Sequence, residues 1–344
     1  MPVSPAMAAA WFPGAVATSA AVTWLALRYA RRRGLMDQPG ERRSHAVATP
    51  RGGGISITVV LLAAILAMGW LYEDLRPVLQ AGALGLVLVA TVGWIDDHRP
   101  LSARIRLLAH ALAAAMLAAA LFVSGHGLLP AAIALGAVLV LVNVWNFMDG
   151  IDGLAASQAA IAALGYALLG GTGTPAWALG LALAGACCGF LPFNFPRARI
   201  FLGDVGSGTL GHALALLVVL ALVAPAEPLA PAGWLLLVLP LAAFLVDATL
   251  TLGRRVLRRE AWWEPHVQHA YQVWSRILGR HAPVTLLYAG WSMVATVLMV
   301  GMTWVNGTFI IVIATTTGWC LFSGAIWAAV QGGSRQGEGR TQNK

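Results

Sequence analysis

Charged residues are scarce in this sequence of 344 residues: Asp, Glu, Lys and Arg together make up only 10% of it, and its one lysine is Lys344. Hydrophobic residues make up 59%, and the mean hydropathy is +0.75. A soluble protein of this length needs more polar surface, and no long polar stretch is available to build an aqueous domain. The composition therefore indicates an integral membrane protein.

Cysteine is scarce too. Cys187, Cys188 and Cys320 all lie in apolar runs, and none has the spacing of a CxxC motif or of a metal-ligand set. A thiolate metal centre is therefore not expected, and the three side chains are interpreted as small buried hydrophobic groups.

Long apolar stretches are what the sequence has in abundance. A helix needs about 20 apolar residues to cross a bilayer, and ten or eleven stretches of that kind follow one another along the chain. They predict an all-α fold, a polytopic transmembrane helix bundle that forms a single domain over residues 1–330 and is followed by a polar, disordered tail over 331–344. The stretches cover approximately 8–28, 54–72, 78–95, 104–123, 128–146, 154–171, 176–194, 207–224, 233–252, 284–304 and 308–330.

Basic residues are distributed unequally between the two sides of this bundle. When the loop over residues 29–53 is placed in the cytoplasm, Arg76 is the only basic residue in an external loop. The positive-inside rule then places the N-terminus outside and the C-terminus inside. The net charge of +8 is thus expected to meet anionic headgroups or a phosphorylated substrate, not nucleic acid. A cleaved signal is not expected, because no basic region precedes the first apolar segment.

Two adjacent carboxylates, Asp96 and Asp97, end an apolar helix on the predicted cytoplasmic side. Acidic residues are unfavourable at a helix C-terminus, where the dipole favours cations, so the pair needs a compensating positive charge. A divalent cation such as Mg²⁺ can supply it, because hard ions prefer carboxylate oxygens and substrate phosphates. The alternative is a solvated helix end.

The next inner loop, over residues 143–153, contains Asn146, Asp149 and Asp152. Two acidic residues three positions apart share one face of a helix, and the glycines beside them let a ligand approach the backbone. This pattern favours a binding loop, although Asp152 could instead cap the following helix.

A third inner segment, over residues 193–208, contains Asn194 and Arg197 and places Asp204 before a helix start. Its glycines resemble an anion-binding turn, in which the amides of a helix N-terminus meet phosphate. The alternative is a helix cap on a flexible loop.

Two further inner loops are basic. One contains His266 and His269, three positions apart, and we favour phosphate contact over zinc because no third soft ligand is nearby. The other runs over residues 37–54, contains Arg51 and ends in three glycines before a helix, an arrangement suited to anions.

All five polar segments fall on one predicted side of the membrane. An ion pathway would place charged residues in the middle of the membrane-spanning stretches. In this chain those stretches are almost free of charge, and Asp247 is the main exception. A transporter or flippase of anionic lipids would also explain the basic loops, but not four Asp-containing inner loops without an outer gate. The distribution predicts an interfacial site where a cytosolic anion meets a molecule carried in the membrane.

Four strings, in order, carry a resemblance to a known family: GWIDDHRPL (93–101), NFMDGIDGLA (146–155), FNFPRARIFLGDVGSGTLG (193–211) and HVQHAYQ (266–272). The chain resembles the polyprenyl-phosphate N-acetylhexosamine-1-phosphate transferases of glycosyltransferase family 4. The resemblance implies transfer of a sugar-1-phosphate from a UDP-sugar to undecaprenyl phosphate with release of UMP. It also implies Mg²⁺ or Mn²⁺, a multi-pass protein of the bacterial inner membrane, a cytoplasmic active site and, as one option, a homodimer.

The resemblance also implies roles for individual residues. The lipid phosphate is expected to attack the diphosphate directly, with Asp97 as a base, and a covalent phospho-enzyme is the alternative. The catalytic residues are expected to be Asp96, Asp97, His266 and His269, the substrate-binding residues Arg51, Asn146, Asp149, Asp152, Asn194 and Arg197, and the metal ligands Asp204, Asn146 and Asp97.

The branch of the family is suggested by two loops. Arg43-Ser44-His45 and the following basic loop look like the enzymes that initiate O-antigen or other surface polysaccharides, including lipopolysaccharide. The phospho-N-acetylmuramoyl-pentapeptide transferases of peptidoglycan synthesis, the alternative, typically carry three consecutive histidines where this chain has His266 and His269 separated by two residues.

Overall fold

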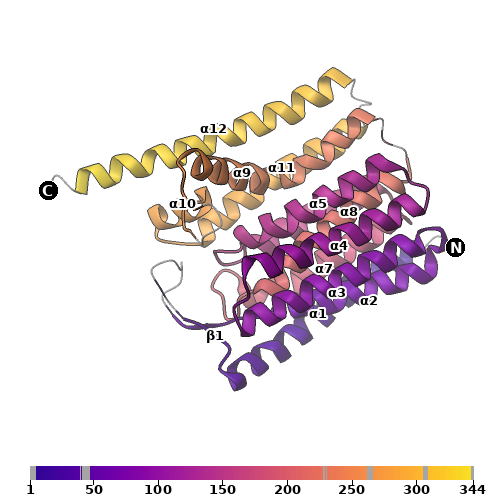
Figure 1. The fold of residues 1–344 in the computed structure, drawn as a ribbon, viewed down its shortest axis with the longest axis horizontal. Helices are drawn as coiled ribbons and strands as arrows, with labels where there is room; N and C mark the ends of the chain where they lie inside the picture. The colour runs from indigo at the N-terminus through magenta and orange to yellow at the C-terminus, as the bar shows by residue number, and fades with distance from the viewer. Residues whose placement is uncertain are drawn as a thin grey trace.

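The computed structural model describes residues 5–38, 40, 47–227, 229, 231–261, 266–304 and 309–341, and it is almost entirely helical (Figure 1). The segment Arg43-Ser44-His45 and the last three residues, 342–344, lie outside the described residues. The elements are α1 (Pro5–Arg33), β1 (Met36–Asp37), β2 (Thr49–Pro50), α2 (Ile55–Leu71), η1 (Glu73–Leu75), α3 (Arg76–His98), α4 (Ala103–Val123), α5 (Leu128–Phe147), α6 (Leu154–Gly170), α7 (Pro175–Asn194), α8 (Asp204–Val223), η2 (Pro231–Leu241), α9 (Ala242–Leu257), α10 (Ala270–Leu278), α11 (Ala282–Trp304) and α12 (Phe309–Thr341).

The predicted polytopic helix bundle is confirmed. Each of the eleven apolar stretches lies in a helix, and one of them is shared between η2 and α9. Among the described residues, nine helical segments are long and apolar enough to cross a membrane, and α2 and α6 are shorter apolar helices. The short helix α10 lies in the late loop, and α12 continues as a helix over 331–341, the first part of the predicted tail.

Helix α8 forms the centre of the bundle. Its residues from Val205 to Ala221 are all buried, and it packs against α3 and α5 (Figure 1). A helix that is apolar on every side suits a protein core or a lipid bilayer, and the burial of α8 shows that other helices surround it. The position of the N-terminus of α8, where Asp204 stands, is therefore determined by the packing of the whole bundle.

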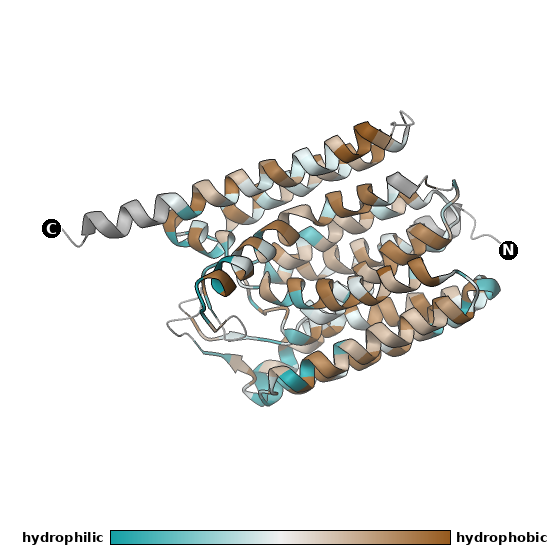
Figure 2. Ribbon diagram, turned by 45° about the horizontal axis from the view of Figure 1, so that its top comes forward, coloured by the Kyte–Doolittle hydropathy of each residue, from teal (hydrophilic) through white to brown (hydrophobic). Residues whose placement is uncertain are grey.

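The polar segments gather at one end of the bundle. The hairpin of β1 and β2, the loops after α3, α5 and α7, and helix α10 lie at the same end as the C-terminus, whereas the N-terminus lies at the other end (Figure 1). Figure 2 shows most of the hydrophilic residues at this end, with hydrophobic residues along the helices. We call this end the polar end.

Backbone hydrogen bonds join two of the predicted loops directly. The amide of Phe201 donates to the carbonyl of Pro50 (2.8 Å), and the amides of Gly53 and Gly54 donate to the carbonyls of Phe201 (2.9 Å) and Leu202 (2.8 Å). The glycine-ended loop before α2 thereby holds the loop that leads into α8.

Close contact between α3 and α8 depends on Gly93. A Cβ atom at this position would lie 2.4 Å from the carbonyl oxygen of Asp204 and 2.6 Å from the amide nitrogen of Val205. The two helices can meet at the polar end only because residue 93 has no side chain.

Gly93→Ala is expected to destabilise the protein by about 1–3 kcal/mol, the usual cost of overpacking, because backbone atoms must move apart. The midpoint of thermal unfolding in detergent, followed by size-exclusion chromatography, measures the effect. The matched control is Gly136→Ala in α5, where a Cβ would meet nothing within 4 Å. Equal midpoints for the two variants would contradict the packing argument.

Candidate functional site

The side chain of Asp97 links the end of α3 to the start of α8. Its Oδ1 accepts a hydrogen bond from the amide of Asp204 (3.0 Å), and its Oδ2 accepts one from the amide of Val205 (3.2 Å). A carboxylate in this position satisfies unpaired amides and interacts favourably with the positive end of the helix dipole. Gly203 makes the approach feasible, because it has a positive φ of 77° and a Cβ there would lie 2.6 Å from Asp97 Oδ2.

Arg51 reinforces this junction. Its Nη2 donates to the backbone carbonyl of Asp97, and its Nε lies 4.0 Å from Asp97 Oδ1. The glycine-ended loop before α2 thus brings the positive charge of Arg51 to a buried carboxylate of the protein itself.

Asp204 and Asp96 share one guanidinium group. Nη1 of Arg106 lies 2.9 Å from Asp96 Oδ2 and 3.4 Å from Asp204 Oδ2, and Nδ2 of Asn146 donates to Asp204 Oδ1 (2.8 Å). The side chain of Asp204 is 33% exposed and that of Asp96 only 9%. Four helices, α3, α4, α5 and α8, therefore converge on one group of side chains, in which Asp204 is the most accessible carboxylate. We call Asp96, Asp97, Asp204, Arg106 and Asn146 the carboxylate cluster.

Arg106 is the member of this cluster that sequence reasoning missed. It lies in the first turn of α4, which Ser102 caps by accepting a hydrogen bond from the amide of Ile105 (3.3 Å). A cation in the first turn opposes the helix dipole, so an arginine there calls for a nearby acidic partner. That mismatch, a few residues after Asp96 and Asp97, was the available signal.

The loop between α5 and α6 brings a further acidic pair close to the cluster. Burial, together with the smaller effect of the charges of Asp97 and Asp152, raises the pKa of Asp149 to about 8. Asp152 is held by His281, whose Nδ1 lies 3.3 Å from Asp152 Oδ2. His281 thus contacts Asp152, whereas the side chain of Asp149 makes no hydrogen bond or ion pair among the described residues.

Asn194 and Arg197, predicted to bind substrate, lie in different environments. Asn194 is buried: its Oδ1 accepts a hydrogen bond from the amide of Gly153 (2.8 Å), and its Nδ2 donates to the carbonyl of Ile200 (3.0 Å). It therefore ties two of the loops together. Arg197 is exposed at the polar end.

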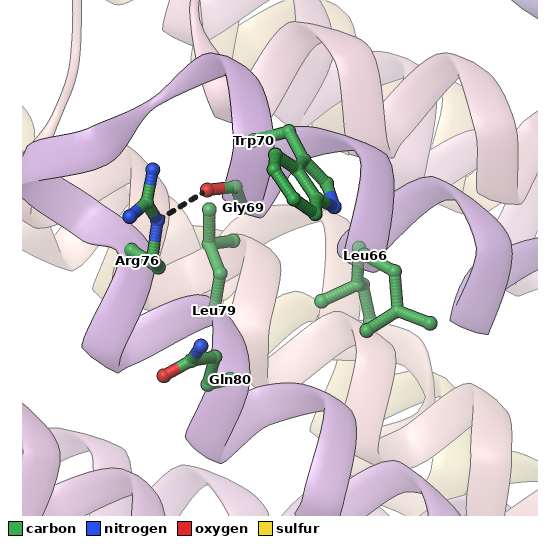
Figure 3. A pocket seen from close by; sticks show the side chains of 7 residues that line it. Leu66, Gly69, Trp70, Arg76, Leu79 and Gln80 are labelled. Carbon is green, nitrogen blue, oxygen red and sulfur yellow. Dashed lines mark hydrogen bonds between the residues drawn. The ribbon is translucent and has the colours of Figure 1, made fainter.

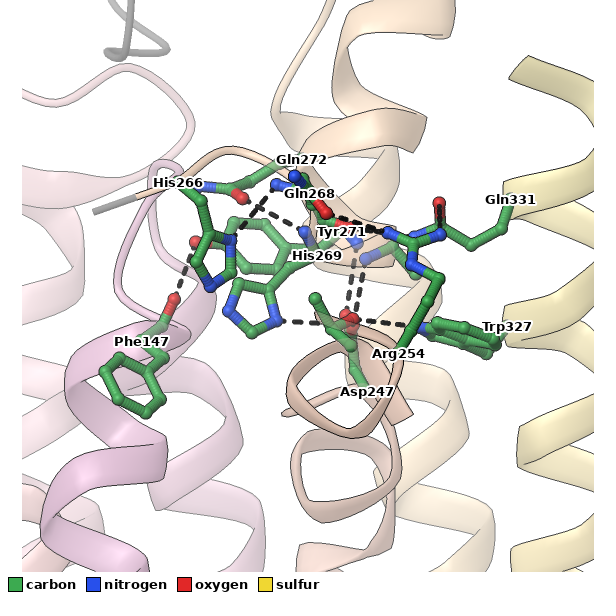
Figure 4. Close-up of polar contacts among 12 residues, drawn as sticks. Phe147, Asp247, Arg254, His266, Gln268, His269, Tyr271, Gln272, Trp327 and Gln331 are labelled. Atoms are coloured by element: carbon green, nitrogen blue, oxygen red, sulfur yellow. Dashed lines mark hydrogen bonds and ion pairs between the residues drawn. The ribbon is translucent and has the colours of Figure 1, made fainter. Parts of the chain in front are cut away.

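The late loop places the two predicted histidines beside the end of α5 (Figure 4). The rings of His266 and His269 lie 4.8 Å apart, and His269 stacks at 6.2 Å on the ring of Phe147. His269 is buried, whereas His266 is partly exposed. Burial lowers the pKa of His266 to about 4, with smaller contributions from the neighbouring charges of His269 and Arg255. Of the two, His266 is the ring that a ligand can reach.

Two cavities lie away from the carboxylate cluster. One of about 250 Å³ is at the opposite end of the bundle, between α2 and α3, where Arg76 donates to the carbonyl of Gly69 beside Trp70 (Figure 3). The other, of about 190 Å³, is lined by α9 to α12 and includes Asp247 and Trp327.

The cluster can be tested for its fit to a divalent cation. In the described part of the chain, no three His, Cys, Asp or Glu side chains lie close enough together to bind a metal ion on their own. Mg²⁺, however, usually takes one or two protein carboxylates and completes its coordination with substrate phosphates and water. Asp204 and Asp96 meet that requirement, so the site fits an ion shared with a substrate and not a closed structural metal centre.

Comparison with known proteins agrees with this arrangement. The model of "Glycosyl transferase family 4" matches residues 79–222, which span α3 to α8 and include every carboxylate of the cluster. The chain is 30% identical over 323 residues to a decaprenyl-phosphate N-acetylglucosaminephosphotransferase of Mycobacterium tuberculosis, with 80% of this chain and 78% of the relative covered.

Two other relatives represent the two kinds of enzyme that the chain resembles. The corresponding Mycobacterium leprae protein is 29% identical over 299 residues, with 74% of this chain and 73% of the relative covered. A phospho-N-acetylmuramoyl-pentapeptide-transferase of Synechococcus is 37% identical, but over 207 residues that cover 52% of this chain and 58% of the relative. The chain therefore belongs to glycosyl transferase family 4, and within it to the polyprenyl-phosphate N-acetylhexosamine-1-phosphate transferases.

Proposed function

We propose that this protein transfers N-acetylhexosamine-1-phosphate from a UDP-sugar to undecaprenyl phosphate and releases UMP. The observation that carries the proposal is the carboxylate cluster, in which Asp96 and Asp204 meet at one arginine at the end of a membrane bundle. Such a site suits a diphosphate that arrives from water and a phosphate that is anchored in lipid.

The orientation of the site is part of the proposal. The polar end carries the arginine-rich loops, and the positive-inside rule supports placing that end in the cytoplasm, with the N-terminus outside. A nucleotide sugar made in the cytosol then reaches the cluster directly. The membrane would be the bacterial inner membrane.

Mg²⁺ or Mn²⁺ is proposed as the cofactor. Asp204 and Asp96 would hold it beside Asn146, whose Nδ2 donates to Asp204 Oδ1, and the ion would neutralise charge on the diphosphate. Arg106 holds the two carboxylates in place, since its guanidinium contacts both. His266 and Arg51 contribute positive or hydrogen-bonding groups on either side for the phosphates.

Direct attack by the lipid phosphate is the mechanism that the contacts favour. A phosphate monoester is already largely ionised near neutral pH, so it needs alignment and charge neutralisation more than a strong base. Both side-chain oxygens of Asp97 accept backbone hydrogen bonds, which suits a residue that orients the start of α8 better than one that forms a covalent phospho-enzyme.

The sugar and pathway form the finer part of the proposal. The two mycobacterial relatives, which cover most of this chain, are named for N-acetylglucosamine phosphate transfer. Their names support UDP-N-acetylglucosamine as donor and initiation of a surface polysaccharide such as O-antigen. The second candidate is the pentapeptide branch, supported by the shorter Synechococcus match.

Asp204→Asn should lower the rate of UMP release by roughly two orders of magnitude, because it removes a charge from the group that faces the diphosphate. The assay follows label from UDP-N-acetylglucosamine into an organic phase that contains undecaprenyl phosphate. Asp74→Asn, an exposed change at the opposite end of the bundle, is the matched control and should keep the wild-type rate. Near-normal activity of Asp204→Asn would mean that the site is misplaced.

Removal of divalent metal should abolish transfer in the same assay, and added Mg²⁺ or Mn²⁺ should restore it, since charge on the diphosphate must be neutralised. Unchanged transfer with EDTA would contradict the proposed cofactor. Metal-independent uptake of solute by vesicles, without any transfer, would support a transporter instead.

A panel of donors distinguishes the two branches. We expect UDP-N-acetylglucosamine to be used at least roughly 100-fold more efficiently than UDP-N-acetylmuramoyl-pentapeptide, because a site shaped for one donor leaves polar groups unpaired with the other. The measurement is kcat/KM for each donor at a fixed concentration of undecaprenyl phosphate. The reverse preference would place the chain in the pentapeptide branch.

A further inference from the structure

Asp247 is a buried carboxylate in α9 that the proposed reaction does not use. Four groups donate hydrogen bonds to it: the amides of Ala270 (2.9 Å) and Tyr271 (3.2 Å), the hydroxyl of Tyr288 (2.8 Å) and the hydroxyl of Thr251 (3.1 Å). A buried charge with this many donors is held in one position. The one charge that stands out in the apolar stretches, that of Asp247, is therefore satisfied by hydrogen bonds within the protein.

The first two donors are the opening amides of α10. Asp247 thus caps this helix from a different helix, satisfying amides that have no partner within α10 and interacting with its positive end. Helix α10 has only nine residues, and a helix of that length is marginal without outside support. The carboxylate of Asp247 therefore fixes the first two amides of α10 to α9.

The same contact fixes the residues that precede α10. Nδ1 of His269 lies 3.5 Å from Asp247 Oδ1, and the ring of His269 adjoins that of His266 (Figure 4). On the other side, the hydroxyl of Tyr271 donates to the carbonyl of Phe147 (2.9 Å), one residue after Asn146. Asp247 therefore contacts His269 directly and His266 through His269. Through Tyr271 it also reaches the end of α5, where Phe147 follows Asn146.

A second set of contacts holds the late loop from the side of α12. Nε2 of Gln331 donates to the carbonyl of Gln268 (2.8 Å), and Nη1 of Arg254 donates to Oε1 of Gln331 (2.8 Å). Gln268 stands between the two histidines in the sequence. The loop is thus supported from α9 and α12 together, and Asp247 is the only charged member that contacts the first amides of α10 among the described residues.

We propose that Asp247 is a positioning residue for the transfer reaction: by capping α10 it holds His266 and His269 against the end of α5, which leads from Asn146 to Asp149, on the nucleotide-sugar side of the site. The inference rests on the proposed function, since it assigns His266 to the phosphates of the donor.

The test is Asp247→Asn in the full-length protein, which keeps the size of the side chain but cannot accept from both amides as a carboxylate does. KM for UDP-N-acetylglucosamine should rise roughly 10-fold or more, because a displaced histidine no longer meets the diphosphate. KM for undecaprenyl phosphate should stay the same. In a His266→Ala background, Asp247→Asn should add little to the donor KM, since the two residues act in one chain of contacts.

The matched control is Thr174→Val, which removes the side-chain cap of α7, where Thr174 accepts a hydrogen bond from the amide of Trp177 (3.2 Å). This variant should lose thermal stability but keep both KM values, which separates positioning from general destabilisation. If Asp247→Asn does not fold, Tyr288→Phe removes one of the four donors and should raise the donor KM in the same direction by a smaller factor.

The outcomes distinguish a failure of the proposed function from a failure of the positioning role. Wild-type protein that moves no label into the organic phase would overturn the proposed function. Active wild-type protein together with a wild-type donor KM in Asp247→Asn, or in Tyr288→Phe if only that variant folds, would overturn the positioning role alone. Equal increases in both KM values, or full additivity with His266→Ala, would also overturn it.

Discussion

The pair of hydrogen bonds from the amides of Asp204 and Val205 to the carboxylate of Asp97 is the contact on which the polar end depends. Helix α8 is apolar and buried along most of its length, so its N-terminal amides need a partner supplied from outside the helix. Asp97 supplies that partner from α3. The same contact places the side chain of Asp204 beside Arg106, where it remains partly exposed.

The starts of α8 and α10 are stabilised in the same way. Asp97 of α3 caps α8, and Asp247 of α9 caps α10, so in both cases a buried carboxylate of one helix satisfies the first amides of another. A charge buried among apolar helices is costly unless several donors surround it, and the amides of a helix start provide such donors. Asp204, Asp149 and His266, by contrast, are partly exposed.

The gathering of the polar segments could be anticipated because charged residues are conspicuous in an apolar sequence. Adjacent Asp96 and Asp97, the Asn146–Asp152 loop and Asp204 stood out as charges in a sequence with almost none, and they do lie at one end of the bundle. Arg106 could not be selected in the same way, because its role depends on α4 lying beside α3 and α8. The sequence predicts that Asn194 binds substrate. In the structure both ends of its side-chain amide have partners within the protein, the amide of Gly153 and the carbonyl of Ile200.

The sequence by itself determined the helical bundle, its approximate spans and the gathering of the polar loops at one end, because apolar length and charge are local properties that lipid and water select directly. Only the tertiary structure decided which contacts each carboxylate makes: Asp97 and Asp247 cap helices, Asp152 contacts His281, and Asp204 stays accessible. These contacts follow from which helix ends meet, and helix ends far apart in the chain meet only when the bundle is packed.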